Sequence, residues 1–207
     1  MKNMKKSFSY PIIFMILITA FFTLVLSLLN YTTKDVIAQN AQIDEWKTLL
    51  YVFNIDYPED NDKKIEELYK EHLEQTKVDD TTIYTAKKDG KDLGYAFPVE
   101  GNGLWGTIRG YAAIDENVNT LLGVDFVSHS ETPGLGGRID EMWFKDQFRN
   151  IDLDGSDSNY LEYRPAADGN IDAITGATLT SKSVKNLLNE DIEEFKELMK
   201  GEDLNGK

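Results

Sequence analysis

Residues 81–100 read TTIYTAKKDGKDLGYAFPVE, and the side-chain pattern of this stretch has the period of two that is typical of β-strands. Asp89-Gly90 divides it into two strand-like runs, and this dipeptide is favoured in the type I′ turn of a hairpin. Two more such runs follow, LWGTIRGYAAID (104–115) and TLLGVDFVSHS (120–130), joined by the polar turn ENVN (116–119). The central part of the chain is therefore predicted to be an antiparallel sheet.

Helical patterns lie on both sides of these strands. Apolar residues recur at spacings of three and four in IAQNAQIDEWKTLLYVFNI (37–55) and over about 181–200. A short charged helix is expected over residues 63–75, another over DEMWFKDQFRN (140–150), and turns with short extended pieces over 151–170. Strands grouped in the middle with helices outside indicate the α+β class rather than an alternating parallel sheet.

The N-terminal region contains an uncharged apolar run over residues 11–29. Crossing roughly 30 Å of hydrocarbon takes about 20 helical residues, so this run is long enough for a transmembrane helix. A cleavable signal is the alternative, since Val36-Ile37-Ala38 resembles a cleavage site, but it lies well past the apolar run, which favours a retained anchor. Lysines precede the span and Asp35 follows it, which predicts a cytoplasmic N-terminus and an extracytoplasmic remainder.

Composition excludes several kinds of function. The chain has 207 residues, a formal net charge of −14 and no cysteine. Such an acidic surface repels phosphate backbones and disfavours nucleic acid as a partner. The absence of cysteine excludes disulfides, a thiolate nucleophile and cysteine-ligated iron–sulfur clusters within this chain. No His/Cys/carboxylate cluster suggests a metal site, and His72 is expected to be solvated in its charged helix.

The first glycine-rich segment is GNGLWGTIRG (101–110), whose glycines approximate G-x-G-x-x-G. This segment precedes a strand instead of joining a strand to a helix, so the dinucleotide-binding interpretation fails. We expect a glycine loop with Trp105 packed in the core. The glycines would still allow close approach of the backbone to a ligand.

The second is SHSETPGLGGRI (128–139), where Pro133-Gly134 should turn the chain. Leu135 stands among glycines and could cover the face of a flat ligand, while Glu131 and Thr132 could address its polar edge. The alternative is a plain loop with Glu131 solvated, which is the commoner state of a glutamate.

The third is IDAITGATLTSKS (171–183), which precedes the last helix. Thr180 or Ser181 is the expected N-cap, so Thr178 would lie just ahead of a helix N-terminus, where anions bind. Gly176 and Ala177 keep the surroundings sterically clear. From the residues alone, a bare helix cap is an equal alternative to a phosphate site.

DAITGATLTS and SETPGLGGRI together resemble the FMN-binding domain that two membrane complexes share, in the C subunit of the sodium-translocating NADH:quinone oxidoreductase and the G subunit of the Rnf complex. The resemblance covers essentially the whole chain, including an N-terminal membrane helix. It implies that a flavin transferase attaches FMN to Thr178 through a phosphoester, and that Asp172 belongs to the motif. At position 175 this chain has threonine where many members of the family have serine. The change is mild because both residues are small and carry a hydroxyl group.

The resemblance further implies a membrane-anchored electron-transfer subunit with other membrane subunits as partners in a redox-driven ion-translocating complex. The expected division is 1–30 for the cytoplasmic tip and transmembrane helix, 31–80 for a membrane-proximal helical segment, and 81–207 for the FMN-binding domain. Catalysis by side chains is not expected, because flavin chemistry belongs to the cofactor. A stand-alone flavin carrier and a flavin-free interaction domain are the alternatives. The site residues implied are Thr178, Thr175, Gly176, Ala177, Asp172, Glu131, Thr132, Gly134, Leu135 and Trp105, with His129 as a further candidate.

Overall fold

The computed structural model describes residues 9–78, 81–88, 90–154 and 159–201. The chain divides between Gln42 and Ile43 into two compact units. Ile43, Leu49 and Leu50 are buried with residues of the sheet domain, so the second unit takes in the last turns of the first helix. The predicted boundaries after residues 30 and 80 stay predictions.

The first unit consists of most of α1, which runs from Ser9 to Val52. It contains an 18-residue window of mean hydropathy 2.8, none of which is buried, so α1 is long and apolar enough to cross a membrane. A signal sequence near an N-terminus meets the same criteria. The apolar run over residues 11–29 is helical, as the sequence predicted.

The second unit is built on a six-stranded antiparallel sheet with the strands in chain order. Its strands are β1 Leu73–Val78, β2 Thr81–Lys88, β3 Lys91–Asn102, β4 Thr107–Asp115, β5 Thr120–Ser128 and β6 Ile151–Asp152. The predicted hairpin is confirmed: Lys88 pairs with Lys91, and Gly90 has φ +76°, while Asp89 lies outside the described residues. The turn between β4 and β5 is also where the sequence predicted it.

Two of the short helices differ from their predictions. Helix α2 spans Asp62–His72 and not residues 63–75, because the chain turns directly into β1, whose six residues all pair with β2. Residues 140–150 form a four-residue helix, α3 (Met142–Lys145), between two 3₁₀ turns, η1 (Gly136–Asp140) and η2 (Asp146–Phe148). Phe144 of α3 and Phe148 of η2 are both buried although no continuous helix joins them.

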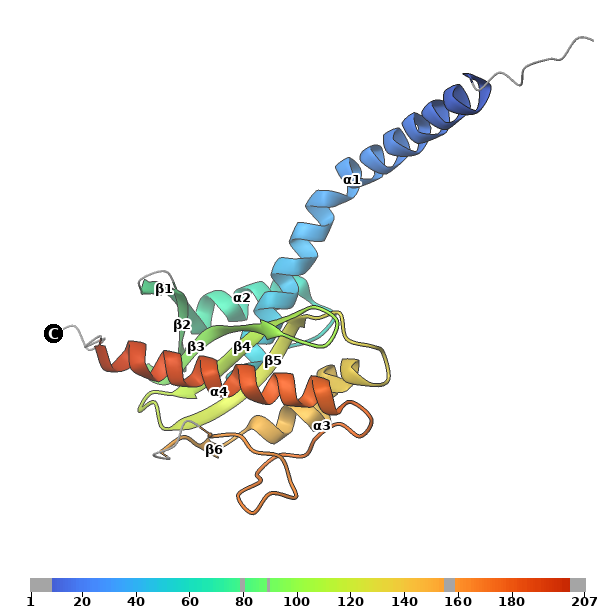
Figure 1. The fold of residues 1–207 in the computed structure, drawn as a ribbon. Coiled ribbons are helices and arrows are strands. Elements are labelled where there is room, and N and C mark those ends of the chain that lie inside the picture. The colour runs from blue at the N-terminus through green and yellow to red at the C-terminus, as the bar shows by residue number, and fades with distance from the viewer. Residues whose placement is uncertain (1–8, 79–80, 89, 155–158, 202–207) are drawn as a thin grey trace, which may run out of the picture. The chain divides into compact units, whose positions relative to one another are not determined.

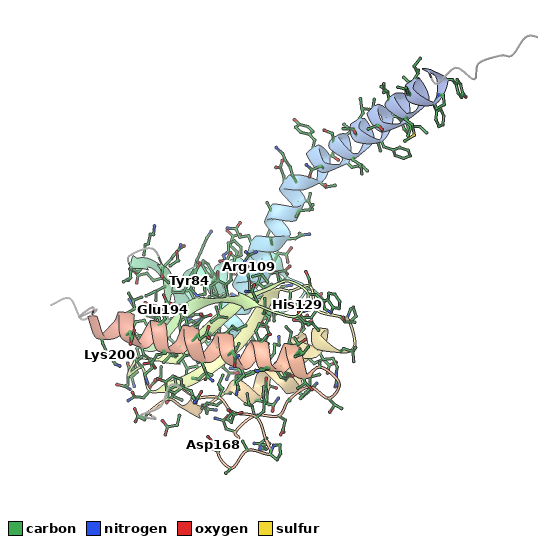
Figure 2. The ribbon with its side chains drawn as sticks, viewed as in Figure 1. Tyr84, Arg109, His129, Asp168, Glu194 and Lys200 are labelled. Carbon is green, nitrogen blue, oxygen red and sulfur yellow. The ribbon has the colours of Figure 1, made fainter. Side chains whose placement is uncertain are left out.

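Helices cover both faces of the sheet (Figure 1). On one face lies α4 (Thr178–Gly201), whose Phe195 ring stacks on Phe97 of β3 with centroids 4.1 Å apart. On the other lie α2 and the last turns of α1, which bury Leu50 and Ile65 against Tyr84, labelled in Figure 2. The α+β architecture expected from the sequence is thus confirmed, and it fixes the N-terminal end of α4 relative to the sheet.

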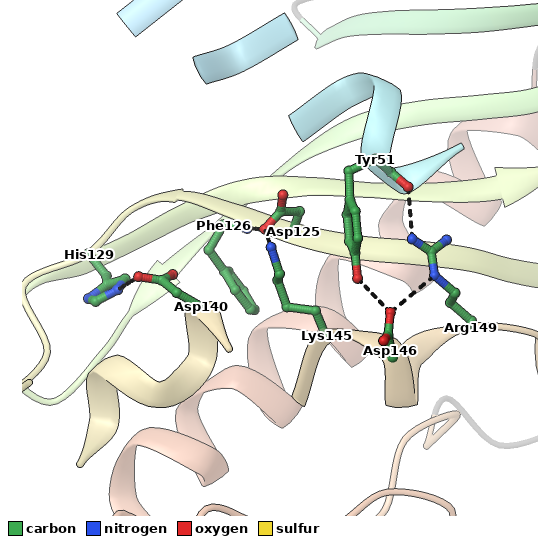
Figure 3. A network of polar contacts seen from close by, with 8 residues as sticks. All are labelled: Tyr51, Asp125, Phe126, His129, Asp140, Lys145, Asp146 and Arg149. Atoms are coloured by element: carbon green, nitrogen blue, oxygen red, sulfur yellow. Dashed lines mark hydrogen bonds and ion pairs between the residues drawn. The ribbon is translucent and has the colours of Figure 1, made fainter. Parts of the chain in front are cut away.

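A polar network fastens the end of α1 to β5 and η2 (Figure 3). The Tyr51 ring lies between Lys145 and Arg149, each 4.4 Å from its centroid, and the Tyr51 hydroxyl donates to Asp146. Arg149 donates to the Tyr51 carbonyl oxygen at 2.9 Å, and Lys145 forms a buried ion pair with Asp125 at 2.8 Å. The network thus runs from the largely buried Lys145–Asp125 pair to the exposed Asp146.

One carboxyl group on α4 makes stability depend on pH. Burial raises the pKa of Asp191 to about 6, against the lowering effect of the hydrogen bond from the Glu100 N–H, and the neighbouring Glu194 and Glu190 add to the rise. The folded protein therefore holds this proton more tightly than the unfolded chain. Protonated Asp191 therefore stabilises the fold fully below its pKa in the unfolded chain, which is near 4. This contribution is lost as pH rises through its folded-state pKa of about 6.

We therefore expect Asp191→Asn to raise the free energy of unfolding at pH 7 by about 1 kcal/mol, after allowance for partial solvation. The asparagine oxygen can still accept the Glu100 N–H. Urea unfolding at pH 7 and pH 4 measures the effect, and the gain should disappear at pH 4. The exposed Glu71→Gln serves as the control with the same change of charge, and an equal gain in both variants would contradict the assignment.

Candidate functional site

Three glycine-containing segments meet at one pocket of about 350 Å³. They come from the β3–β4 connection, from the loop after β5, and from the start of α4. Ligand pockets in proteins are commonly about 300–1,000 Å³, so this one has the size for part of a cofactor. Its lining residues are Leu104, Trp105, Glu131, Thr132, Leu135, Gly136, Gly176, Ala177, Thr178, Leu179 and Thr180.

The TGAT segment presents Thr178 to this pocket. Ile174 and Ala177 are buried, whereas Thr175 and Thr178 are exposed, so the apolar side chains hold the segment in place while the threonines face outward. Gly176 has φ +83°, a left-handed conformation that favours glycine, and it turns the chain into α4. The Thr178 hydroxyl is therefore accessible on a fixed backbone.

Helix α4 begins at Thr178, which corrects the predicted N-cap at Thr180 or Ser181. Those two side chains have other partners: the Ser181 hydroxyl accepts the Ile174 N–H at 3.0 Å, and the Thr180 hydroxyl donates to Glu131. Thr178 thus lies within the first turn, where helical N–H groups have no partner in the helix. No acidic residue occupies this turn, so it suits an anion such as a phosphate.

Asp172 lies six residues before Thr178 and outside the pocket lining. Its carboxylate is exposed and forms an ion pair with Arg164 at 2.8 Å. Gln147 holds its backbone, because the side-chain oxygen accepts the Asp172 N–H at 2.6 Å and the amide group donates to the Asp172 carbonyl at 3.4 Å. Thr175 and Gly134 are likewise exposed and do not line the pocket.

Glu131 is only 5% exposed, unlike the solvated side chain that the sequence favoured. One carboxylate oxygen, Oε1, accepts the N–H groups of Leu104 at 2.7 Å and Trp105 at 3.1 Å. The other, Oε2, accepts the Thr180 hydroxyl. This side chain therefore joins all three segments of the pocket wall.

Trp105 is 67% exposed, which corrects the expectation that it packs in the core. Leu104, Leu135 and Leu179 also line the pocket while remaining exposed. Leu104 and Leu179 were not among the predicted site residues, because nothing in their local patterns marks an apolar residue as exposed. Four large apolar side chains around one opening indicate a surface that a flat apolar group can cover.

His129 does not line the pocket, and its ring contacts Asp140 (Figure 3). Its Nδ1 atom accepts the Glu131 N–H at 3.1 Å, so Nε2 carries the proton toward Asp140, 2.8 Å away. The side chain is 14% exposed. It therefore positions the backbone at Glu131 and does not contact the pocket.

The residues fit FMN in three separate respects. Apolar side chains can cover an isoalloxazine ring, the first turn of α4 can hold a phosphate, and Thr178 offers a hydroxyl for a phosphoester. Among the described residues no group of three or more His, Asp or Glu side chains is placed to hold a metal ion.

Residues 103–193 match the family described as FMN-binding domain. The resemblance drawn from the two motifs is thereby confirmed. The matched range contains all three segments that line the pocket.

Curated proteins of one kind are similar to part of this chain. The chain is 37% identical over 117 residues to the C subunit of the Na(+)-translocating NADH-quinone reductase of Pseudomonas aeruginosa, covering 52% of this chain and 45% of that protein. The corresponding protein of Neisseria meningitidis is 37% identical, over 51% of this chain and 43% of that protein. The chain thus spans less than half the length of these curated relatives.

Solved structures confirm the fold. The Shewanella oneidensis NqrC structure aligns with a TM-score of 0.61 at 16% identity, over 71% of this chain and 89% of that one. The structure of the C subunit of the Na(+)-translocating NADH-quinone reductase from Parabacteroides distasonis aligns with a TM-score of 0.66 at 22% identity, over 80% of this chain and 96% of that one.

Proposed function

We propose that this protein is a membrane-anchored electron-transfer subunit that carries FMN as a phosphoester on Thr178. The observation that carries the proposal is the exposed Thr178 in the first turn of α4, at a pocket that the loop after β5 and the β3–β4 connection also line. Bound FMN would supply the electron transfer. The chain's own residues attach it, hold its phosphate and cover its ring.

Each segment has a separate role in this proposal. Thr178 supplies the attachment oxygen, and the N–H groups around it hold the phosphate. Leu135 and Trp105 cover the ring, and Thr132 lines its edge. Asp172, held in place by Gln147, and Thr175 lie on the exposed side of the attachment segment, where a flavin transferase can reach them.

The partners are proposed from the relatives' names. Those relatives are subunits of a Na(+)-translocating NADH-quinone reductase, which supports a place for this chain in a multi-subunit membrane complex of that type or the Rnf type. A stand-alone extracytoplasmic flavin carrier is the alternative. Purification from native membranes through a tag distinguishes them: co-purified membrane subunits support the complex, and the flavin-bearing chain alone supports the carrier.

The proposed topology has its own test. Lysines precede the apolar run and Asp35 follows it, so the sheet domain should lie outside the cytoplasm. Protease added to intact spheroplasts is expected to remove the domain completely, while a cytoplasmic marker protein survives. Protection of the domain until the cells are lysed would reverse the orientation.

Ring positioning is tested at Leu135, because the phosphoester fixes only the phosphate end of FMN. Leu135→Ala removes three carbon atoms from a half-exposed side chain, so we expect covalent FMN to remain while the ring loses contact worth about 1 kcal/mol. If the lost contact energy differs between oxidised and reduced flavin, that difference shifts the midpoint potential. The shift is at most about 40 mV for one electron.

Spectroelectrochemical titration beside denaturing-gel fluorescence measures both properties of the Leu135→Ala variant. Val127→Ala removes exposed apolar atoms outside the pocket lining and should leave both unchanged. An unchanged spectrum and potential in Leu135→Ala would show that this residue does not cover the ring.

A further inference from the structure

Glu131 places a charged group in the wall of the pocket. Its three hydrogen-bond partners, two backbone N–H groups and the Thr180 hydroxyl, can all act as donors. An ionised carboxylate only accepts hydrogen bonds, so the arrangement suits the charged form of Glu131. Within the described part of the chain, no lysine, arginine or histidine forms an ion pair with this carboxylate.

Two glycines make room for this carboxylate. A Cβ atom at Gly103 would lie 2.4 Å from Oε1 of Glu131, and one at Gly136 would lie 2.7 Å from Oε2. Any larger residue at either position would have to displace the carboxylate. Gly103 and Gly136 thus leave space for a side chain of the protein itself.

We propose that Glu131 is a positioning residue that holds the three pocket segments together and also keeps the reduction potential of the bound flavin low. The inference rests on the proposed function. Reduction adds negative charge to a flavin, and a fixed carboxylate in the same pocket wall opposes that addition. Because Glu131 is 5% exposed, water screens this effect weakly.

Glu131→Gln separates the two roles. The glutamine oxygen can accept both backbone N–H groups, and its NH₂ group can donate to the Thr180 hydroxyl, so the pocket should keep its shape. We expect wild-type flavin content by denaturing-gel fluorescence and an unchanged melting temperature. The equilibrium for one-electron reduction should shift about tenfold toward the reduced flavin, which corresponds to about 59 mV more positive.

Two further variants serve as controls. All variants are made in the full chain, co-expressed with the transferase and purified in detergent. Glu131→Ala removes both the charge and the contacts, and it should lower flavin content in a way that glutamine rescues. Thr180→Val removes one donor but keeps the charge, so the potential must not rise. This variant also tests the proposal if the glutamine variant fails to fold.

The outcomes separate this inference from the proposed function. Wild-type protein without covalent flavin would contradict the proposed function itself. Flavin-loaded Glu131→Gln with a wild-type potential would overturn the charge effect. Wild-type flavin content in Glu131→Ala would overturn the positioning role, and any rise in potential for Thr180→Val would overturn the charge assignment.

Discussion

Thr178→Val is expected to abolish covalent flavin entirely. Valine nearly preserves the shape of threonine and replaces its hydroxyl by a methyl group, so the phosphoester has no oxygen to form on. The Thr178 side chain is exposed, and the fold should therefore tolerate the change. The measurement is flavin fluorescence of the denatured protein in a gel, after co-expression with the flavin transferase.

Two variants make the result specific. Thr178→Ser restores a hydroxyl at the same position and should restore fluorescence. Ser183→Ala removes a hydroxyl further along α4, outside the pocket lining, and should leave fluorescence at the wild-type level. Fluorescence that persists in Thr178→Val would remove the basis for attachment at this residue.

Lys145→Met should cause the largest loss of stability. Lys145 and Asp125 form an ion pair at 2.8 Å, and their side chains are only 12% and 11% exposed. Burial raises the pKa of Asp125 even with Lys145 beside it. Removing the lysine leaves a buried carboxylate without a counter-charge, which costs about 3–5 kcal/mol.

The loss should depend on pH with a defined sign. Without Lys145 the pKa of Asp125 in the folded state rises further, whereas in the unfolded chain it stays near 4. Protonation of the folded state then relieves the penalty, so the deficit should be smaller at pH 5 than at pH 7.

Urea unfolding of the detergent-solubilised chain measures the deficit. Lys64→Met breaks an exposed pair with Glu67 and should change little. The double variant Lys145→Met/Asp125→Asn should recover much of the loss, since asparagine can still accept the Phe126 N–H. A pH-independent loss, undiminished in the double variant, would mean that lost packing and not the unpaired charge causes it.

Local patterns were sufficient to predict the central hairpin and α4. Gly90 takes the positive φ that the predicted turn needs, and the apolar stripe of α4, including Val184, Leu188 and Ile192, is buried as expected. Strand β1 was missed because it is stabilised by pairing with β2, while its own residues, LEQTKV, alternate poorly. Its pairing outweighs the helical tendency of residues 73–75.

The site was predictable only in part, because its geometry depends on distant residues. The burial of Glu131 results from donors that lie 26, 27 and 49 residues away in the chain. The exposure of Trp105 is a property of the β3–β4 connection as folded, and no local pattern separates an exposed tryptophan from a core one. The motif segments, in contrast, are continuous in sequence and could be recognised there, and the structure brings them together at one pocket.

The most direct test of covalent attachment at Thr178 is the intact mass of the full chain after co-expression with the flavin transferase, followed by mapping of its proteolytic peptides. We predict a mass increase equal to one FMN less one water, carried by the peptide that contains Thr178. An unmodified mass, or an FMN found on a peptide without Thr178, would contradict this attachment.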